Sequence, residues 1–146
     1  MEEIIRDIEL FLRRSDFAVR VEGRKVLSQL SVTPPQFSAL QVVVKNKKEP
    51  ISIGELSRSM GLAFSTVTDL VDRMENLGFV KRRRDDKDRR VIRIEPLDKG
   101  IAVMDKVVNH RVDFLGDIIK ENYSENDMKR LHEELKKLSE LLKENK

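Results

Sequence analysis

The chain contains no cysteine and no tryptophan among its 146 residues, and only one tyrosine. Without cysteine, disulfide bonds, thiolate catalysis and thiol-based redox sensing are excluded. No apolar run approaches the ~20 residues needed to cross a bilayer, and acidic residues follow Met1 where a signal peptide would be basic. We therefore expect a cytoplasmic protein with no membrane partner.

Residue patterns for catalysis or metal binding are also missing. The two histidines, His110 and His132, fall in different predicted helices, and no cysteine is available to join them as zinc ligands. No carboxylate accompanies a nucleophile or a glycine-rich loop that could hold a phosphate group. We expect neither an enzyme, nor a metal site, nor a cofactor.

The balance of apolar and charged residues indicates exposed helices. Hydrophobic residues make up 39% of the chain and charged residues 38%. The chain is too apolar to be disordered, yet it is very rich in charge for a monomeric globule. Its length allows one compact domain, or a small lobe carrying longer helices.

The stretch 52–95 organises the rest of the chain, and it begins with a short helix. Ser52 and Glu55 have the S-x-x-E spacing of a capping box, in which each side chain accepts a hydrogen bond from the backbone N–H of the other residue. Gly61 follows the helix where a residue without a penalty at positive φ is needed. The apolar face of this helix consists of Ile53, Leu56 and Met60.

A second helix, from about Phe64 to Leu77, and a two-stranded ribbon complete the stretch. The helix carries apolar residues three and four apart and ends before Gly78. One strand starts at Phe79 and runs to Arg84, and the chain returns through Val91 to Ile94. Two helices and a hairpin in this order predict a winged helix-turn-helix lobe over residues 33–96. The apolar residues of the helix are Val67, Leu70, Val71, Met74 and Leu77.

The predicted hairpin is strongly basic. Residues 81–93 hold eight Lys or Arg against three Asp, a local net charge of +5, whereas the whole chain carries +3. A surface of this kind can replace the counterions of a phosphate backbone. Alone, a charged hairpin would more often be merely solvated. Joined to the two helices, it predicts binding to double-stranded DNA.

Long helices are predicted on both sides of the lobe. Residues 1–30 and 97–122 carry apolar residues at mostly helical spacing, and Ser124 and Asp127 indicate the cap of a last helix. A further start signal stands at residues 33–36, where Thr, Pro and Gln have the spacing of a cap, a first helical position and the third residue after the cap. The predicted fold class is mainly α with a small β-hairpin.

The last helix has a coiled-coil-like seam. Its leucines alternate in steps of three and four, and the first helix has more apolar positions than one packed face needs. We therefore expect a homodimer, with 1–30 and 97–146 as the dimerisation helices. The residues expected at that interface are Ile4, Ile8, Met128, Leu131, Leu135, Leu138 and Leu142.

These motifs together resemble the multiple-antibiotic-resistance regulator (MarR) family of transcription factors. The resemblance lies in the run STVTDLVDRMENLGFVKR from Ser65, in D-x-R at residues 88–90 and in DKG at residues 98–100, and it extends over almost the whole chain as a single domain, 1–146. The chain departs from the family at Pro96-Leu97, where a Leu-Thr pair is usual, and at Asp69, where many members carry a basic or neutral polar residue.

The expected function is that of a homodimeric transcriptional regulator. By resemblance it is most often a repressor, and a pseudo-palindromic operator is expected for a two-fold protein. Short hydroxyl residues at the start of the second motif helix can reach base edges in the major groove, Arg73 can reach a phosphate, and the hairpin would follow the minor groove. The expected DNA-binding residues are Ser65, Thr66, Thr68, Arg73, Lys87, Arg89 and Arg90.

Two further expectations concern single residues. Asp88 lies on the same strand face as Arg90 and is expected to orient its guanidinium. The family resemblance also implies a small, often aromatic ligand near Phe11, Phe37 and His110.

A rival interpretation is a winged helix that binds a protein or RNA. Six Phe, one Tyr and no Trp leave few surfaces for stacking on unpaired RNA bases. Binding of random duplex DNA at low salt would discriminate between the two interpretations.

Overall fold

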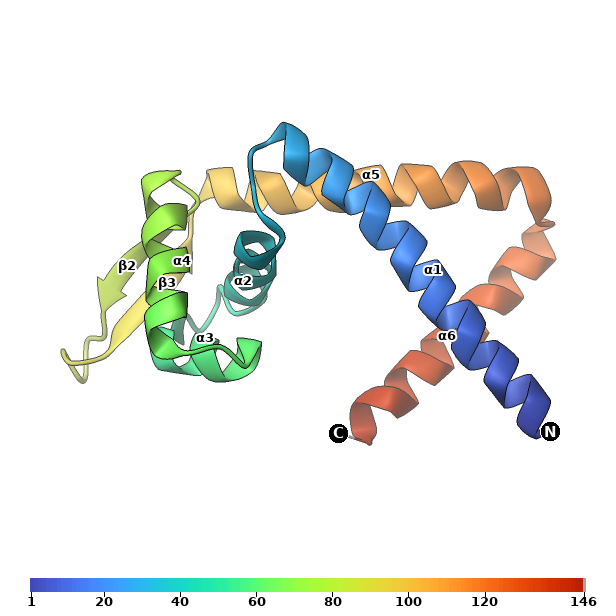
Figure 1. The fold of residues 1–146 in the computed structure, drawn as a ribbon, viewed down its shortest axis with the longest axis horizontal. Coiled ribbons are helices and arrows are strands. Elements are labelled where there is room, and N and C mark those ends of the chain that lie inside the picture. The colour runs from blue at the N-terminus through green and yellow to red at the C-terminus, as the bar shows by residue number, and fades with distance from the viewer. Residues whose placement is uncertain (146) are drawn as a thin grey trace. The chain divides into compact units, whose positions relative to one another are not determined.

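The computed structural model describes residues 1–145 and is mainly helical with one small sheet, as predicted (Figure 1). It forms two compact units, residues 1–110 and the part of the chain that begins at Arg111. The elements in chain order are α1 (Glu2–Gln29), α2 (Pro34–Lys45), β1 (Ile51–Ser52), α3 (Ile53–Met60), α4 (Phe64–Asn76), β2 (Val80–Arg84), β3 (Ile92–Pro96), α5 (Asp98–Asn122) and α6 (Glu125–Glu144).

Local start signals position three of the helices, and the structure confirms each of them. Thr33 Oγ1 accepts a hydrogen bond from the Gln36 N–H at 3.3 Å, and Gln36 Oε1 accepts one from the Thr33 N–H at 3.0 Å. Ser52 and Glu55 form the same reciprocal cap at the start of α3. Ser124 Oγ accepts from the Asp127 N–H and so caps α6. These contacts satisfy N–H groups that have no partner inside a helix.

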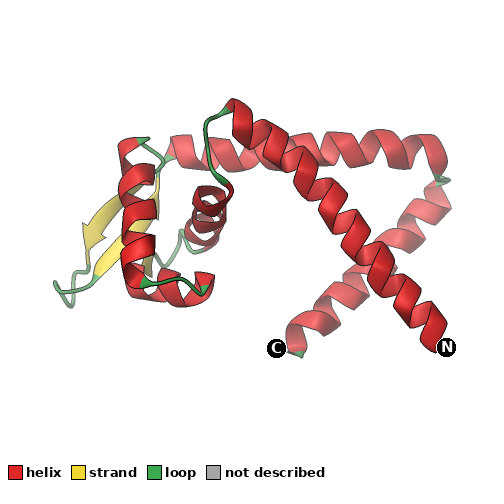
Figure 2. Ribbon diagram, viewed as in Figure 1, coloured by secondary structure: helices red, strands yellow, loops and turns green. Residues whose placement is uncertain are grey.

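The sheet has three strands rather than the predicted two. All three are antiparallel, in the order β1-β3-β2, so β3 is the central strand. Figure 2 shows the strands of the hairpin in yellow beside the helices of the lobe. Ile51 pairs with Ile94. The predicted two-stranded ribbon is present as β2 and β3. The third strand was not predicted, because β1 has only two residues, too few to show an alternating pattern, and because Ser52 is at the same time the cap of α3.

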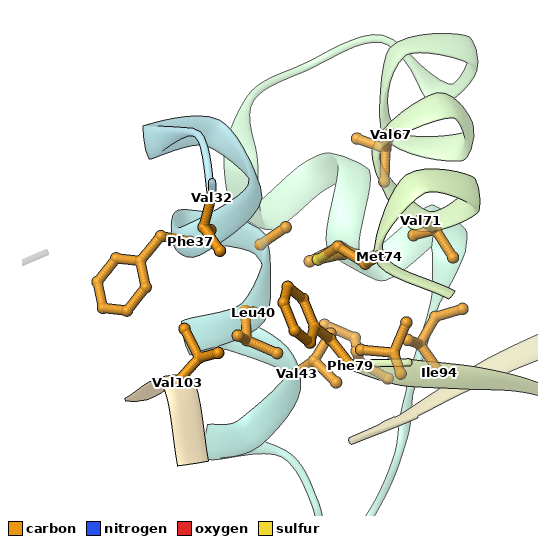
Figure 3. Close-up of a cluster of buried hydrophobic side chains, with 14 of the residues drawn as sticks. Val32, Phe37, Leu40, Val43, Val67, Val71, Met74, Phe79, Ile94 and Val103 are labelled. Atoms are coloured by element: carbon orange, nitrogen blue, oxygen red, sulfur yellow. The ribbon is translucent and has the colours of Figure 1, made fainter. Parts of the chain in front are cut away.

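One hydrophobic core holds the first unit together. Side chains from the end of α1, from α2 to α4, from the sheet and from the start of α5 meet in it, and Figure 3 shows part of this cluster. Burying a large apolar side chain contributes about 1.5–3 kcal/mol, so this cluster is the main source of the lobe's stability. Its most deeply buried large members are Leu40, Val43, Leu56, Val67, Val71, Met74, Val80, Ile94 and Val107.

The start of α5 lies tightly against the lobe. A Cβ atom at Gly100 would lie 2.3 Å from the carbonyl oxygen of Phe79 and 3.1 Å from Leu40 Cδ1. The Leu97 N–H donates to the same Phe79 oxygen at 2.9 Å. Only a residue without a side chain allows this approach, so the first turns of α5 belong to the packing of the lobe.

The second unit contains the rest of α5 and α6. Among its described residues, α6 buries no side chain completely, although its sequence has a regular apolar seam. No helix within residues 1–145 is both long enough and apolar enough to cross a membrane.

Candidate nucleic-acid interface

Helix α4 presents an exposed polar face because its other side is fixed in the core. Val67, Val71 and Met74 are completely buried. The predicted base-reading residues Ser65 and Thr66 are exposed in the first turn, and within residues 1–145 neither hydroxyl has a hydrogen-bond partner. Their hydroxyl groups are therefore available to donate to, or accept from, base edges in a major groove.

Thr68 and Arg73 lie on the same helix in different situations. The Thr68 hydroxyl donates to the carbonyl oxygen of Phe64 at 2.9 Å, so its hydrogen is engaged while its lone pairs remain available. Arg73 is exposed and forms no ion pair with any other residue of the range 1–145. A free guanidinium at this place can bind a phosphate.

The hairpin of β2 and β3 is the wing of the lobe, and its tip, residues 85–91, is ordered around Asp85. One carboxylate oxygen of Asp85 accepts hydrogen bonds from the backbone N–H groups of Lys87 and Asp88, at 3.2 and 3.0 Å. The other accepts from Arg93 Nε at 3.2 Å. These hydrogen bonds, above all the one from Asp88 N–H, lower the pKa of Asp85. The carboxylate therefore holds the wing tip in one shape.

Arg90 and Asp88 form the contact on which the predicted orienting role of Asp88 depends. Arg90 Nε and Nη2 donate to the two carboxylate oxygens of Asp88, each at 3.1 Å. The hydrogen bonds from the Arg90 side chain are the main cause of the lowered pKa of Asp88. The side chain of Arg90 is nevertheless 90% exposed, so a fixed guanidinium projects from the wing tip.

Lys87 and Arg89 lie beside this pair and differ from it. Both side chains are exposed, and within the described residues neither forms an ion pair. They can follow a phosphate backbone without first breaking a contact inside the protein.

Arg82 joins the wing to α4, a role that the sequence analysis missed. Its guanidinium donates to Glu75 at 3.0 Å and also binds Asp72, and the Glu75 carboxylate accepts the Arg82 backbone N–H at 2.8 Å. Both acidic residues lie on α4 and the arginine lies on β2, so three charged side chains hold α4 and the hairpin together. The sequence shows acidic residues on α4 and a basic hairpin after it, but no spacing that pairs Arg82 with Asp72 and Glu75.

Other basic residues of the hairpin are also neutralised inside the lobe. Arg83 Nε donates to Glu95 at 2.5 Å, which raises the pKa of Arg83. Arg93 binds Asp85 and, at 3.4 Å, Glu55. The local net charge of +5 thus overstates the free charge of the hairpin, and the unpaired cations are concentrated at its tip.

The residues expected at a dimer interface are only partly covered in the described chain. Ile4 and Ile8 in α1 and Leu135 and Leu142 in α6 are exposed, and the remaining three are half-buried, namely Met128, Leu131 and Leu138.

The three expected ligand residues occupy different environments, and all lie in the first unit. Phe37 is only 5% exposed and belongs to the core cluster, whereas Phe11 is exposed. His110 Nε2 lies 2.9 Å from a carboxylate oxygen of Glu22, which links α5 to α1. Hydrogen bonds from Lys25 and then from His110 lower the pKa of Glu22. Phe37 thus lies in the core, Phe11 at the surface and His110 in the contact between α5 and α1.

An exposed polar helix, held by ion pairs beside a basic hairpin and over one apolar core, defines a winged helix-turn-helix protein of the DNA-binding class. Comparison with known proteins places the chain within that class. The model of the MarR family matches residues 32–92.

Two known proteins match this chain over nearly its whole length. A Bacillus subtilis (strain 168) protein, named as the uncharacterized HTH-type transcriptional regulator YsmB, is 38% identical over 141 residues, which cover 97% of this chain and 94% of that protein. The structure of a MarR family protein from Bacillus stearothermophilus is 36% identical, covers 98% of both chains and has a TM-score of 0.83. The chain therefore belongs to the MarR family and is a transcriptional regulator of the MarR type.

A more distant structure shares the fold alone. MepR of Staphylococcus aureus, solved as a complex with DNA, is 16% identical, with a TM-score of 0.71 and coverage of 92% of this chain and 98% of that one.

Proposed function

We propose that the chain is a homodimeric repressor that binds a pseudo-palindromic operator in double-stranded DNA and is released by a small molecule. The observation that carries the DNA-binding part is the joint exposure, on one lobe, of the Ser65 and Thr66 hydroxyls and of the cations at the wing tip. Arg82 holds these two surfaces in a fixed relation.

In the proposed complex the first turn of α4 enters the major groove. Ser65, Thr66 and the Thr68 lone pairs contact base edges, while Arg73 binds a phosphate. The core residues on the opposite side of α4 keep this face directed outward. The helix thus reads sequence with short, well-positioned side chains.

The wing contributes both affinity and shape recognition. Lys87 and Arg89 bind phosphates, and Arg90, held by Asp88, enters the minor groove. Narrow A·T-rich minor grooves have an enhanced negative potential that attracts arginine. The wing therefore favours A·T-rich flanks of the operator.

Dimerisation is supported by apolar surface that the described chain leaves exposed. Ile4 and Ile8 in one unit and the leucine seam of α6 in the other are the kind of surface that a second copy buries. Two lobes related by a two-fold axis then require two half-sites whose centres lie about 10 base pairs apart.

The repressor role and the ligand rest on the family resemblance. A small aromatic molecule that binds near Phe11, Phe37 and His110 would change the relation between the lobe and the dimer helices and release the DNA. The His110–Glu22 contact between α5 and α1 is the local observation in favour of this site. A screen of phenolic and other aromatic compounds for release of bound DNA, repeated with His110→Ala, tests it.

The test of the main proposal starts with random duplex DNA at low salt. A DNA-binding regulator shows salt-dependent binding, and repeated selection from a random pool then yields one pseudo-palindromic sequence. The absence of any binding to duplex DNA, with a protein partner or an RNA retained instead, contradicts the proposal and favours the rival function as an interaction module.

A further inference from the structure

An aromatic ring is exposed at the N-terminal end of α4, the helix that enters the major groove in the proposed complex. Phe64, the first residue of α4, is 59% exposed, and Leu62, two residues earlier, is 38% exposed. Such exposure costs free energy in water, since burying a Phe contributes about 1.5–3 kcal/mol.

Packing within the lobe does not explain the presence of this aromatic ring. Phe64 lies outside the cluster of core side chains, and among the described residues its ring takes part in no cation–π contact. Its backbone carbonyl accepts the Thr68 hydroxyl, so the first turn is held in place while the ring remains free. The backbone of Phe64 is therefore structural and its side chain is available.

The position of the ring on α4 directs it toward DNA. Phe64 and Thr68 are four residues apart and lie on one flank of the helix. Further along the same flank, Asp72 and Glu75 are bound by Arg82 of the wing. Helical side chains lean toward the N-terminus of their helix, so the ring extends beyond the end of α4 that enters the groove in the proposed complex.

We propose that Phe64 contacts the 5-methyl group of a thymine in the major groove of the operator and so determines specificity at that base pair. The inference rests on the proposed DNA-binding function. A phenyl ring neither donates nor accepts a conventional hydrogen bond, and the thymine methyl is the apolar group that base pairs present in the major groove. The phenyl ring cannot stack on bases, because the bases of an intact duplex are already stacked on one another.

Charge on the same lobe favours DNA over an apolar protein surface as the occupant. Arg73 on α4 and Lys87 and Arg89 at the wing tip are exposed without ion pairs among residues 1–145. A partner that binds a lobe with these unpaired cations and also accepts an apolar ring must itself be anionic around an apolar group. The major groove, with its methyl groups between phosphate backbones, has this chemistry.

The experiment removes the methyl group and the ring separately. A duplex is selected from a random pool by the wild-type protein, and each thymine in turn is replaced by deoxyuridine, which lacks only the methyl. At one thymine in each half-site the replacement should weaken wild-type binding about fourfold, the value of one buried methyl group. For Phe64→Ala, which no longer has the ring, the same replacement should change affinity by less than about twofold, the scatter expected when two changes are independent.

Two variants serve as controls. Leu77→Ala removes an exposed apolar side chain, 36% exposed, from the other end of α4, and it should retain the full deoxyuridine penalty. Phe64→Leu keeps an apolar side chain at the same place and should retain part of the penalty. Circular dichroism and sedimentation of each variant establish that fold and oligomeric state are unchanged.

Three results overturn the inference. The first is an equal deoxyuridine penalty for wild type and Phe64→Ala at every thymine, and the second is the absence of any thymine whose methyl matters. The third is failure of the wild-type protein to bind duplex DNA at all, which refutes the proposed function as well and is thereby distinguishable from the other two.

Discussion

Arg89 and Arg90 are neighbours in the sequence, yet their side chains differ in the structure. Arg90 donates two hydrogen bonds to Asp88, whereas the Arg89 side chain forms no ion pair within the described residues. A guanidinium with a fixed direction is suited to a narrow groove, and one without an ion pair is suited to phosphates along the backbone. The two residues should therefore contribute to DNA binding in different ways.

Replacement of Arg90 by alanine should weaken operator binding and lessen the preference for A·T-rich flanks. Each lost groove or phosphate contact should reduce the slope of log K against log salt by about 1. Arg89→Ala should show the reduced slope with the flank preference intact, and Asp88→Ala a milder form of the Arg90→Ala loss. Fluorescence anisotropy over a salt series measures all three variants. Unchanged affinity with lowered thermal stability for Arg90→Ala would make Arg90 a structural residue instead.

Thr66 and Thr68 should also differ in how much they contribute to base preference. Thr66→Ala should change base preference at particular operator positions, by about 1 kcal/mol or more at each discriminated pair. Thr68→Ala should have a smaller effect, because the Thr68 hydroxyl already donates to Phe64. Selection from a random pool with each variant shows the preference directly. A uniform loss over all sequences would identify these residues as phosphate contacts.

At the scale of the elements, the wing depends on side chains that bind backbone groups. Asp85 accepts two backbone N–H groups of the tip and the Arg93 side chain. No long run of strand pairing orders residues 85–91, so the shape of the tip depends on this carboxylate in its charged form. The wing should therefore respond to mutation and to acid more readily than the core does.

Asp85→Ala should increase exchange of the Lys87 and Asp88 amide protons while leaving core amides protected. The pKa of Asp85 is lowered from its ordinary value of 3.8, so its stabilising contribution is fully present above pH 3.8 and is lost as the pH falls through the lowered pKa. Hydrogen exchange followed by NMR, in wild type and Asp85→Ala, tests this. Equal amide exchange in the two proteins near neutral pH would show that Asp85 does not hold the tip of the wing in shape.

Gly100 controls how α5 meets the lobe. Gly100→Ala places a Cβ 2.3 Å from the Phe79 carbonyl oxygen, and such overpacking should lower the free energy of unfolding by about 1–3 kcal/mol. Gly54→Ala in α3 is the matched control, because its Cβ would meet only Arg58 Nη1 at 3.6 Å and Ser52 Oγ at 3.9 Å. The control should be neutral or stabilise by up to about 1 kcal/mol. Urea unfolding compares the two, and equal stabilities would contradict the close approach.

For the whole molecule, the proposed function depends on a second copy of the chain. The seam of α6 repeats every three and four residues, and α6 buries none of its residues completely within the described structure. A regular apolar seam that the chain itself does not cover is the signature of association between helices. The operator should then show the same two-fold symmetry as the protein.

The double variant Leu135→Lys and Leu138→Lys should be monomeric and should lose operator binding, with the lobe still folded. Glu133→Lys with Glu140→Lys, on the side of α6 away from the seam, is the control and should remain dimeric. Sedimentation equilibrium gives the oligomeric state, and binding to the selected duplex gives the function. A monomer that binds the full operator with unchanged affinity would refute the dimer requirement.

The sequence by itself determined what depends on neighbours along the chain. The caps at Thr33, Ser52 and Ser124, the turn at Gly61 with φ of 64°, and the buried side of α4 all follow from spacings of three or four residues. These interactions are local, so the pattern that predicts them is complete within one short stretch. The helix-turn-helix and its family resemblance are built from such stretches.

Only the tertiary structure decided which distant residues meet. β1 pairs with β3 across more than 40 residues, Arg93 reaches Glu55, and Gly100 approaches the carbonyl of Phe79. With 29 basic and 26 acidic residues in the chain, the sequence allows many ion pairs, and nothing in their spacing selects Arg82 with Asp72 and Glu75. Packing of the core places these groups side by side, and this placement determines which cations are neutralised within the lobe and which remain free at the wing tip.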